Sequence, residues 1–271
     1  MPRPKPLTAR STRVKAARRL TRRATRLAER QFLAEGPQAV REALAVSGCV
    51  VEVFATYDAG LRHRDIFEAC AIAEVPWRRV DDAALATLSD TVSPQGVVAV
   101  CGFLEHQLDA VLAASPTLLA VCASVRDPGN AGSVIRSADA AGASAVVLAG
   151  TSVDRYNSKV VRASVGSLFH LPVLEVGAVP ETIAALKASG LTVLVADGSG
   201  ETSLDDAVDS GLLARPTAWV FGNEAWGVST AELALADSVV RVPIYGRAES
   251  LNLATAATLC LYASARAQRS A

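Results

Sequence analysis

The sequence has few of the residues that build metal or redox centres. Its 271 residues include three histidines, one methionine and five cysteines. His63, His106 and His170 are far apart and lack the spacing of zinc ligands, so we expect no metal site. No two cysteines form a CxxC pair, and most lie in apolar runs, where a free thiol behaves as a small hydrophobic side chain. This pattern predicts a reduced, cytoplasmic protein.

Long apolar runs are also missing, although 51% of the residues are hydrophobic. Because no stretch of about 18 uninterrupted apolar residues occurs, we expect no membrane span. The first residues lack the apolar core of a signal peptide, so we do not expect secretion. The length and the apolar content are sufficient for a large core in one or two domains.

The net charge is zero, which at first argues against a nucleic-acid partner. The distribution argues for one, because residues 1–30 contain eleven basic residues and one acid, whereas the remainder has 16 basic and 26 acidic residues. A basic arm on an acidic body is typical of a chain that binds a polyanion locally. The alternatives are a solvated tail and an internal electrostatic partner for the acidic body. Three prolines predict disorder over residues 1–10, and the absence of proline and glycine predicts a basic helix over 11–30.

The chain after this arm predicts an α/β protein. Residues 31–105 alternate short strands, such as Val50 to Ala55 and Gly96 to Phe103, with helices, and form a small α/β domain. Residues 106–116 are helix-like and are the expected linker. From residue 117 to 271, apolar strands alternate with helices, which predicts a parallel sheet with helices on both faces.

Two polar, glycine-containing loops follow expected strands of this larger domain. The apolar run Trp219 to Phe221 ends at Gly222, and Gly222 and Gly227 bracket a short loop whose amides can approach a ligand. The run Val239 to Ile244 leads into a second loop and a helix from about Leu253, which Ser250 or Asn252 can cap. Ligands bind at such strand ends in parallel α/β sheets. By spacing alone, both loops could equally be ordinary turns between a strand and a helix.

The residues of these loops resemble a known family. FGNE…G, then VPIYGRAESLN and a helix of small residues, together with the upstream segment DPGNAGSVIRSA, resemble the three motifs of the SpoU (TrmH-type) RNA ribose 2′-O-methyltransferases of the SPOUT superfamily, in the same order. The resemblance covers residues 118–265 well. It extends more weakly over 31–105, where FLAEGPQAVREAL and TVSPQGVVAV resemble the family's N-terminal substrate-binding domain.

The resemblance implies a fold, a reaction and partners. The fold is a SPOUT domain with a deep trefoil knot, and the protein is expected to be a homodimer with its active site near the subunit interface. The reaction transfers a methyl group from S-adenosylmethionine (AdoMet) to a ribose 2′-hydroxyl of RNA, with 23S rRNA as the first candidate. Arg62, Arg64, Arg78 and Arg79 are the candidate RNA contacts of the small domain, or else ordinary surface arginines.

The resemblance also assigns roles to residues. Arg136 acts on the 2′-hydroxyl with help from a substrate phosphate; since a free arginine is a very poor base, orienting the phosphate and stabilising the alkoxide is an equally good assignment. Asn130 orients Arg136 or the ribose, and Glu224 fixes a loop or holds Arg136. Ser250 and Asn252 order the last loop and touch substrate or cofactor. The residues expected to line the cofactor are Gly222, Val242 and Leu251.

Two alternatives stay open. One is a tRNA ribose 2′-O-methyltransferase, although the shorter tRNA members of the family lack a separate N-terminal domain. The other is a non-catalytic RNA-binding or ribosome-assembly factor that keeps the fold. Against this second alternative, the chain retains every motif residue expected at a catalytic position.

Overall fold

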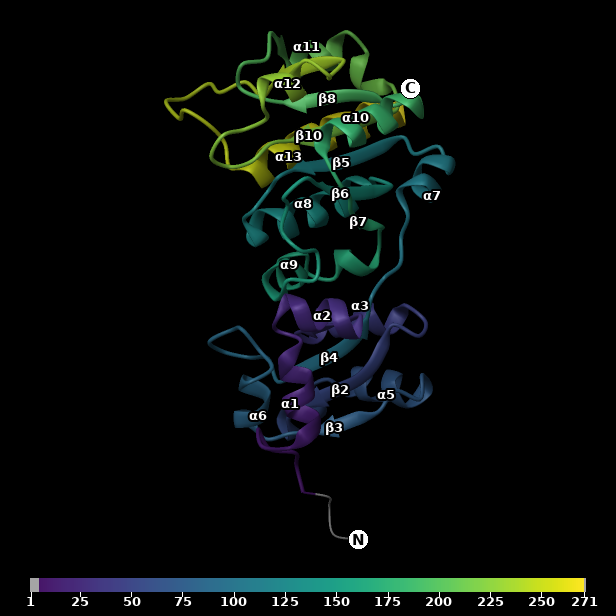
Figure 1. The fold of residues 1–271 in the computed structure, drawn as a ribbon, viewed down its shortest axis with the longest axis vertical. Helices are drawn as coiled ribbons and strands as arrows, with labels where there is room; N and C mark the ends of the chain where they lie inside the picture. Colours follow the sequence, from purple (N-terminus) through teal and green to yellow (C-terminus); the bar gives the residue numbers. More distant parts are fainter. Residues whose placement is uncertain (1–4, 271) are drawn as a thin grey trace. The chain divides into compact units, whose positions relative to one another are not determined.

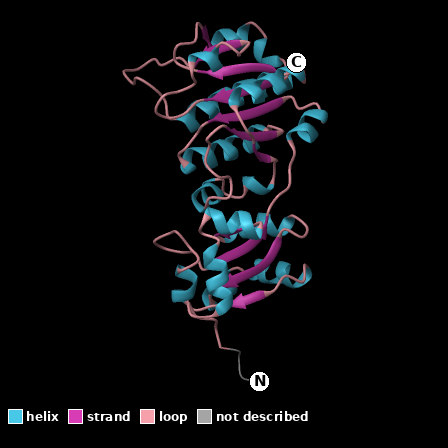
Figure 2. Cartoon of the chain, viewed as in Figure 1, coloured by secondary structure: helices cyan, strands magenta, loops and turns pink. Residues whose placement is uncertain are grey.

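The computed structural model describes residues 5–270, which form two compact units (Figures 1 and 2). One unit, the N-terminal unit, comprises the described residues up to Glu105 together with Tyr156–His170. The other, the C-terminal unit, comprises His106–Arg155 and the chain from Leu171 onward. Both units combine a sheet with helices, so the α/β class predicted from the sequence is confirmed. Within residues 5–270, no helix combines the length and the apolar character needed to span a membrane.

The N-terminal unit is built on a mixed four-stranded sheet. The strand order is β1 (Gln31–Glu35), β4 (Val97–Gly102), β2 (Val50–Ala55) and β3 (Trp77–Arg79). Strand β4 runs antiparallel to both of its neighbours, whereas β2 and β3 are parallel. The connecting helices are α3 (Pro37–Ala45), α4 (Tyr57–Arg62), α5 (Arg64–Ile72) and α6 (Asp82–Ala86).

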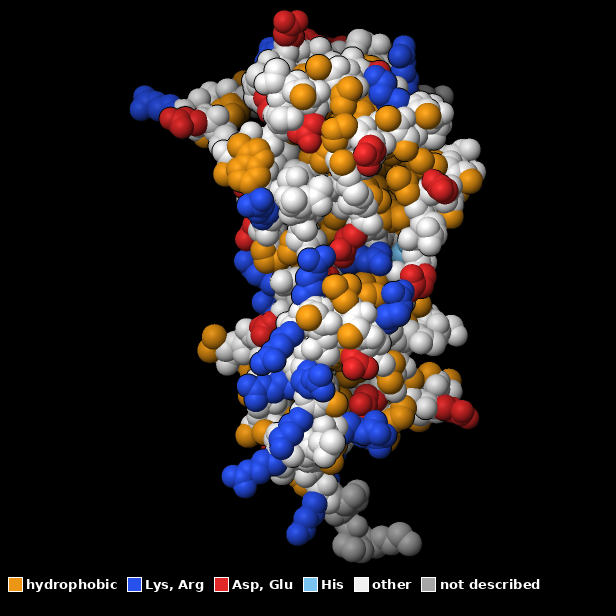
Figure 3. Space-filling view, viewed as in Figure 1, with side chains coloured by type: hydrophobic (Ala, Val, Ile, Leu, Met, Phe, Trp, Pro, Cys, Tyr) orange, Lys and Arg blue, Asp and Glu red, His pale blue; other side chains and the backbone are white. Residues whose placement is uncertain are grey.

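The basic N-terminal segment is part of this unit and not a separate arm. It forms α1 (Thr12–Arg19) and α2 (Arg23–Glu29), and Val14, Ala17 and Leu20 are buried in a core cluster with Phe54. The prediction of disorder is wrong for residues 5–10, because Leu7 donates to the Arg79 carbonyl (2.8 Å) and accepts from the Asp81 amide (3.1 Å); residues 1–4 lie outside the described part. Most of the basic side chains are exposed, and lysines and arginines gather over α1 and α2 in Figure 3. Arg26 is the exception in these two helices, because it is buried and donates to the Leu20 and Thr21 carbonyls.

Residues 156–170 also belong to the N-terminal unit, although the sequence predicted that residues 117–271 form the larger domain. They form α9 (Ser158–Ala163) and the 3-10 turn η1 (Ser167–Phe169), separated by Gly166 at φ +98°. The Phe32 ring stacks on Tyr156 at 4.3 Å and on Phe169 at 6.1 Å. These aromatic contacts join segments more than 120 residues apart, which helix periodicity cannot reveal.

The C-terminal unit is a parallel sheet of seven strands, as the alternating pattern predicted. Their order is β7 (Val173–Glu175), β6 (Ala145–Ala149), β5 (Leu118–Ala123), β10 (Thr217–Phe221), β8 (Thr192–Ala196), β11 (Ser238–Arg241) and β9 (Thr202–Ser203). Every residue of β5, β6 and β10 is buried, as expected for strands covered on both faces. The helices are α7 (Leu108–Ala113), α8 (Pro128–Ala141), α10 (Val179–Ala188), α11 (Leu204–Asp209), α12 (Thr230–Leu233) and α13 (Leu253–Ser270), with a 3-10 turn η2 (Leu212–Ala214).

Helices α7 and α13 are both anchored to this sheet. Leu108, Val111 and Leu112 of α7 pack against the apolar core, so the segment expected as a linker contributes to the C-terminal unit. Helix α13 packs against α8 and β10. The buried Trp219 indole of β10 donates a hydrogen bond to the Ser264 hydroxyl of α13 at 2.8 Å. This bond satisfies two polar groups that would otherwise be buried without a partner.

Candidate active site

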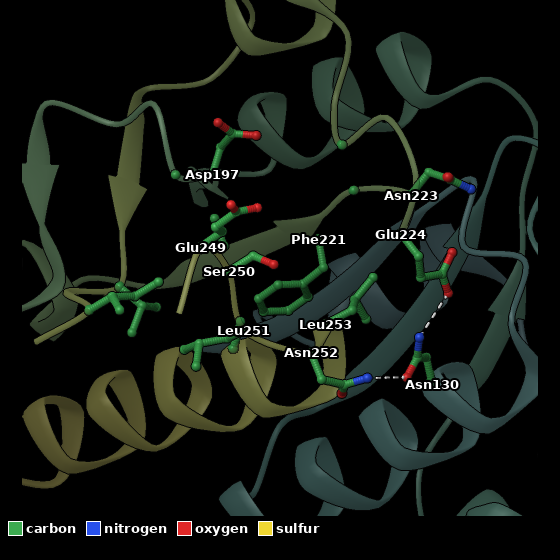
Figure 4. A pocket seen from close by; sticks show the side chains of 17 residues that line it. Asn130, Asp197, Phe221, Asn223, Glu224, Glu249, Ser250, Leu251, Asn252 and Leu253 are labelled. Atoms are coloured by element: carbon green, nitrogen blue, oxygen red, sulfur yellow. Dashed lines mark hydrogen bonds between the residues drawn. The ribbon is translucent and has the colours of Figure 1, made fainter. Parts of the chain in front are cut away.

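A pocket of about 500 Å³ lies at the carboxyl ends of the central strands of the C-terminal unit (Figure 4). We call it the C-terminal pocket; its walls come from the loops after β8, β10 and β11 and from the first turn of α8. Carboxyl ends of parallel strands are the usual ligand-binding edge of an open α/β sheet. Seven of the eight site residues expected from the sequence line this pocket, and only Arg136 does not. The seven are Asn130, Gly222, Glu224, Val242, Ser250, Leu251 and Asn252.

The loop after β10 is closed on itself. The backbone of Asn223 and Gly227 is joined by two hydrogen bonds, of 3.0 and 2.9 Å. A Cβ atom on Gly222 would lie only 2.6 Å from the Val228 amide nitrogen. No side chain fits at Gly222 unless the backbone moves, which explains why the apolar strand ends in glycine. The buried Asn223 amide fixes the loop further by donating to the Ser124 carbonyl at 2.7 Å.

A hydrogen-bonded row connects all three sequence motifs. Glu224 Oε1 accepts from Asn130 Nδ2 (3.1 Å), and Asn130 Oδ1 accepts from Asn252 Nδ2 (3.0 Å), along the dashed lines in Figure 4. Glu224 also accepts from the backbone amides of Asp127 and Arg126, at 3.2 and 3.3 Å. Of the two roles expected for Glu224, the geometry therefore corresponds to fixing a loop.

Helix termini position the asparagines of this row. Asp127 caps α8 by accepting from the Asn130 amide at 2.8 Å, and Pro128 occupies the first turn of that helix. Asn252 Oδ1 accepts from the Ala254 amide at 2.9 Å, so Asn252, and not Ser250, caps α13. Each asparagine is thereby held at the start of a helix that lines the pocket.

Arg136 is the exception among the expected site residues. It lies on an exposed face of α8 and does not line the C-terminal pocket. It follows Asn130 by six residues, which places it about 240° around the helix from Asn130. Within residues 5–270, its guanidinium makes no hydrogen bond or ion pair, so the expected contacts with Asn130 and Glu224 are absent from a single copy of the chain. Leu259 and Tyr262 of the neighbouring α13 are also exposed, and Tyr262 donates to the Ala140 carbonyl of α8.

The acidic character of the pocket was not predicted from the sequence. Asp197, at the end of β8, and Glu249 line it together with Glu224, and none of its lining residues is a lysine or an arginine. Asp197 Oδ1 accepts from the amide and the hydroxyl of Ser199, at 2.9 and 2.7 Å. Asp197 could have been found by applying the strand-end argument to the segment VLVAD as well as to Trp219 to Phe221.

Two further groups lie beside the pocket. Burial, and secondarily the Glu224 carboxylate, raise the pKa of the Cys122 thiol to about 12, so this cysteine stays protonated and is not a nucleophile. Trp226, in the loop after β10, is 58% exposed, and the Arg126 guanidinium lies 5.0 Å from its ring centroid. An exposed ring beside a cation is a surface on which a nucleic-acid base can stack.

Two models of known protein families match this chain, one in each part of the sequence. Residues 117–262 match the model described as the SpoU rRNA Methylase family. Residues 11–99 match the model described as the MRM3-like substrate binding domain.

Individual proteins are similar over nearly the whole chain. The 23S rRNA (guanosine(2553)-2′-O)-methyltransferase RlmP of Bacillus subtilis is 33% identical over 254 residues, which are 94% of this chain and 96% of that protein. A solved structure described as an RNA 2′-O ribose methyltransferase has a TM-score of 0.82 at 31% identity and covers 98% of this chain and 100% of its own. The SpoU methyltransferase AviRb of Streptomyces viridochromogenes, solved in complex with the cofactor AdoMet, has a TM-score of 0.81 at 29% identity, with 96% and 100% covered.

Proposed function

Because the chain belongs to the SpoU rRNA methylase family, we propose that it transfers a methyl group from AdoMet to a ribose 2′-hydroxyl of 23S rRNA. The observation that carries this proposal is the row formed by Glu224, Asn130 and Asn252. It brings one residue from each of the three motifs together at the strand ends of the C-terminal sheet.

The residues of the C-terminal pocket suit AdoMet. When bound there, AdoMet supplies an activated methyl group on a positively charged sulfur. The carboxylates of Asp197 and Glu249 favour a ligand that carries net positive charge, and the absence of lysine and arginine from the lining residues avoids repulsion. Gly222, Val242 and Leu251 line the walls, and about 500 Å³ is in the usual range for a small-molecule site.

Arg136 is the proposed catalytic residue. Its guanidinium orients a phosphate of the substrate and stabilises the negative charge that develops on the 2′-oxygen as the proton leaves. Asn130, held between Glu224 and Asn252, orients the ribose at the mouth of the pocket. Ser250 lines the same wall and orders the last loop against the substrate.

We also propose that the protein is a homodimer that uses the exposed face of α8 and α13. Leu259 and Tyr262 form an apolar patch on that face, and Arg136 lies on the exposed side of the adjoining helix. Because none of the described residues that line the pocket is cationic, Arg136 of a second copy is the proposed source of the catalytic arginine. Light scattering should give the mass of two chains, and Leu259→Glu should shift it toward one. The trefoil knot of the family stays a prediction.

Ribosomal RNA is the favoured substrate because residues 11–99 match a substrate-binding domain and the full-length relative RlmP acts on 23S rRNA. A tRNA methyltransferase is the second candidate. The test is calorimetry with AdoMet, followed by transfer of a tritiated methyl group to unmodified 23S rRNA and to bulk tRNA. Binding with label on a ribose of 23S rRNA is the expected result. Label in tRNA alone would show that tRNA, and not rRNA, is the substrate. Failure to bind AdoMet would favour a non-catalytic RNA-binding protein.

A further inference from the structure

A second large cavity lies in the N-terminal unit, far from the motifs in sequence. This N-terminal groove has a volume of about 740 Å³ and is formed by residues between Lys5 and Arg79. It lies where β2 and β3 end, because Thr56 and Tyr57 follow β2 and Arg78 and Arg79 end β3. These two strands are the parallel pair of the sheet, so the groove occupies the edge at which parallel sheets bind ligands.

Three aromatic side chains line the N-terminal groove. Tyr57 is 46% exposed and Phe67 48% exposed, and Phe67 meets the ring of Trp77 edge-on at 5.4 Å. Large aromatic side chains in a monomer are normally buried, and a cluster of exposed ones indicates a binding surface. The chain has only six phenylalanines, four tyrosines and three tryptophans, and three of these aromatic side chains line this one groove.

The charge of the groove has a single sign. Lys5, Arg13, Arg64, Arg78 and Arg79 line it, and none of its described lining residues is acidic. Glu52 offsets part of this charge, because it pairs with Arg13 at 2.8 Å and with Arg78 at 3.2 Å. Within residues 5–270, no carboxylate pairs with Lys5, Arg64 or Arg79. Three of the four arginines proposed from the sequence as RNA contacts therefore converge here, whereas Arg62 is not among the lining residues.

A helix cap and close packing hold the aromatic and cationic side chains of the groove in place. Thr56 caps α4 by accepting from the Ala59 amide at 3.3 Å, which fixes Tyr57 in the first turn. The Arg79 guanidinium lies 5.6 Å from the centre of the Tyr57 ring. A Cβ atom on Gly60 would lie 3.4 Å from the Trp77 ring, so the small residue at this position allows α4 to approach the indole closely. Leu7 closes the far wall through its bonds to Arg79 and Asp81.

We propose that the N-terminal groove binds an unpaired nucleotide of the substrate RNA, with its base stacked on Tyr57 and Phe67. Lys5, Arg64 and Arg79 then lie against the flanking phosphates. Exposed aromatic rings interleaved with arginines are the chemistry that recognises unstacked bases, whereas paired bases are not free to stack on protein rings. The assignment rests on the proposed function only in taking RNA as the partner.

The test measures binding of the full-length protein to two fluorescent RNAs of equal length, an unstructured 12-mer and a hairpin in which every base is paired and the loop is a linker that carries no bases. Tyr57→Leu removes the ring but keeps an apolar side chain, and Tyr57→Phe keeps the ring. We expect Tyr57→Leu to weaken binding of the 12-mer about 10-fold, the typical effect of one base–ring stack, with little change for the hairpin. Tyr57→Phe should bind as the wild type does. Ile72→Ala, which shortens an exposed side chain on α5 outside the groove, is the matched control.

The proposal would be overturned by equal affinity of Tyr57→Leu and the wild type for the 12-mer, or by equal losses for the 12-mer and the hairpin. Displacement of the 12-mer by polyglutamate at the same charge concentration would also overturn it, because a general polyanion site needs no rings. A 12-mer with one 5-iodouridine should crosslink to the peptides that contain Tyr57 or Phe67, and crosslinking elsewhere only would count against the groove.

AdoMet calorimetry on the same preparations separates this proposal from the proposed function. A wild type that binds AdoMet and methylates rRNA, without any ring-dependent RNA binding, would refute the groove alone. Ring-dependent RNA binding by a wild type that does not bind AdoMet would refute the methyltransferase alone.

Discussion

The C-terminal pocket and the N-terminal groove have opposite charge. Among the described residues, the pocket is lined by three carboxylates and by no lysine or arginine, whereas the groove is lined by five cationic side chains and by no carboxylate. The first suits a cationic methyl donor and the second suits a polyanion. The net charge of zero is therefore the sum of two specialised regions, and it gives no information about either partner.

The largest effect on this comparison is expected from removing Arg136, the proposed catalytic cation, which does not line the acidic pocket. Arg136→Ala should reduce methyl transfer by about 100- to 1,000-fold, the typical cost of one group that stabilises developing negative charge. The dissociation constant of AdoMet should stay the same, because Arg136 does not line the pocket. Tritium transfer and calorimetry measure the two quantities, and Arg215→Ala, another exposed arginine of the C-terminal unit, is the control. Near-normal methylation by Arg136→Ala would refute the assignment.

A change at Gly222 should break the C-terminal pocket and leave the N-terminal groove intact. Gly222→Ala places a methyl group against the Val228 backbone, so the loop must shift, and AdoMet should bind about 5- to 150-fold more weakly, since overpacking typically costs about 1–3 kcal/mol. Affinity for the unstructured RNA should remain within about twofold. Gly246→Ala is the matched control, because a Cβ atom there meets no described atom within 4 Å. Unchanged AdoMet binding by Gly222→Ala would mean that the cofactor does not use this loop.

Salt should separate the two cavities without any mutation. Three phosphate contacts on single-stranded RNA predict about a 20-fold loss of affinity between 50 and 200 mM KCl, because each contact releases a condensed counterion. AdoMet carries one net charge, so its affinity should change by less than about twofold over the same range. Anisotropy and calorimetry across a KCl series provide the two slopes. Equal slopes would contradict the assignment of the polyanion to the groove.

The smallest expected effect tests the hydrogen-bonded row at the C-terminal pocket. Glu224→Gln keeps the shape but replaces one acceptor oxygen with an NH₂ group, which faces an amide donor of Arg126, Asp127 or Asn130. The cost of one unsatisfied donor is about 1–3 kcal/mol, so we expect kcat/KM to fall about 10-fold or more. Steady-state kinetics with Asp197→Asn as a second variant distinguishes loop fixing from simple loss of negative charge. An Asp197→Asn variant with the same defect would favour charge as the cause.

Much of the C-terminal unit could be predicted from the sequence because its signals are local. Buried strands rich in apolar residues, such as β5 and β10, together with the glycine after β10 and the capped helices, determine the parallel sheet and the positions of Gly222, Asn130 and Asn252. The pocket was predicted to form at strand ends, and those ends do meet there. Asp197 was missed because the resemblance, and not the strand-end argument, was used to choose residues.

The N-terminal unit was predicted less well for two reasons. Basic residues hide one apolar helix face in the sequence, and the core depends on contacts between residues that are far apart along the chain. The apolar positions Val14, Ala17 and Leu20 are spaced as one face of a helix, but seven basic residues of 11–29 hide this stripe in the composition. The aromatic partners of Phe32 come from residues 103, 156 and 169, which no local pattern connects. The position of Arg136 outside the pocket follows from helix geometry only once the orientation of Asn130 is known.

Residues 156–170 complete the N-terminal unit although they follow part of the other unit in the chain, and this order has a consequence for biosynthesis. Chains fold as they emerge from the ribosome, and a domain encoded by one continuous segment can finish before the next begins. This unit cannot, because the rings of Tyr156 and Phe169, which cover Phe32, are translated only after β5, α8 and β6 of the other unit. Until then Phe32 and Phe103 lack part of their cover. Folding of the two units must therefore overlap in time, and a chaperone that binds exposed aromatic side chains would have its longest opportunity during that interval.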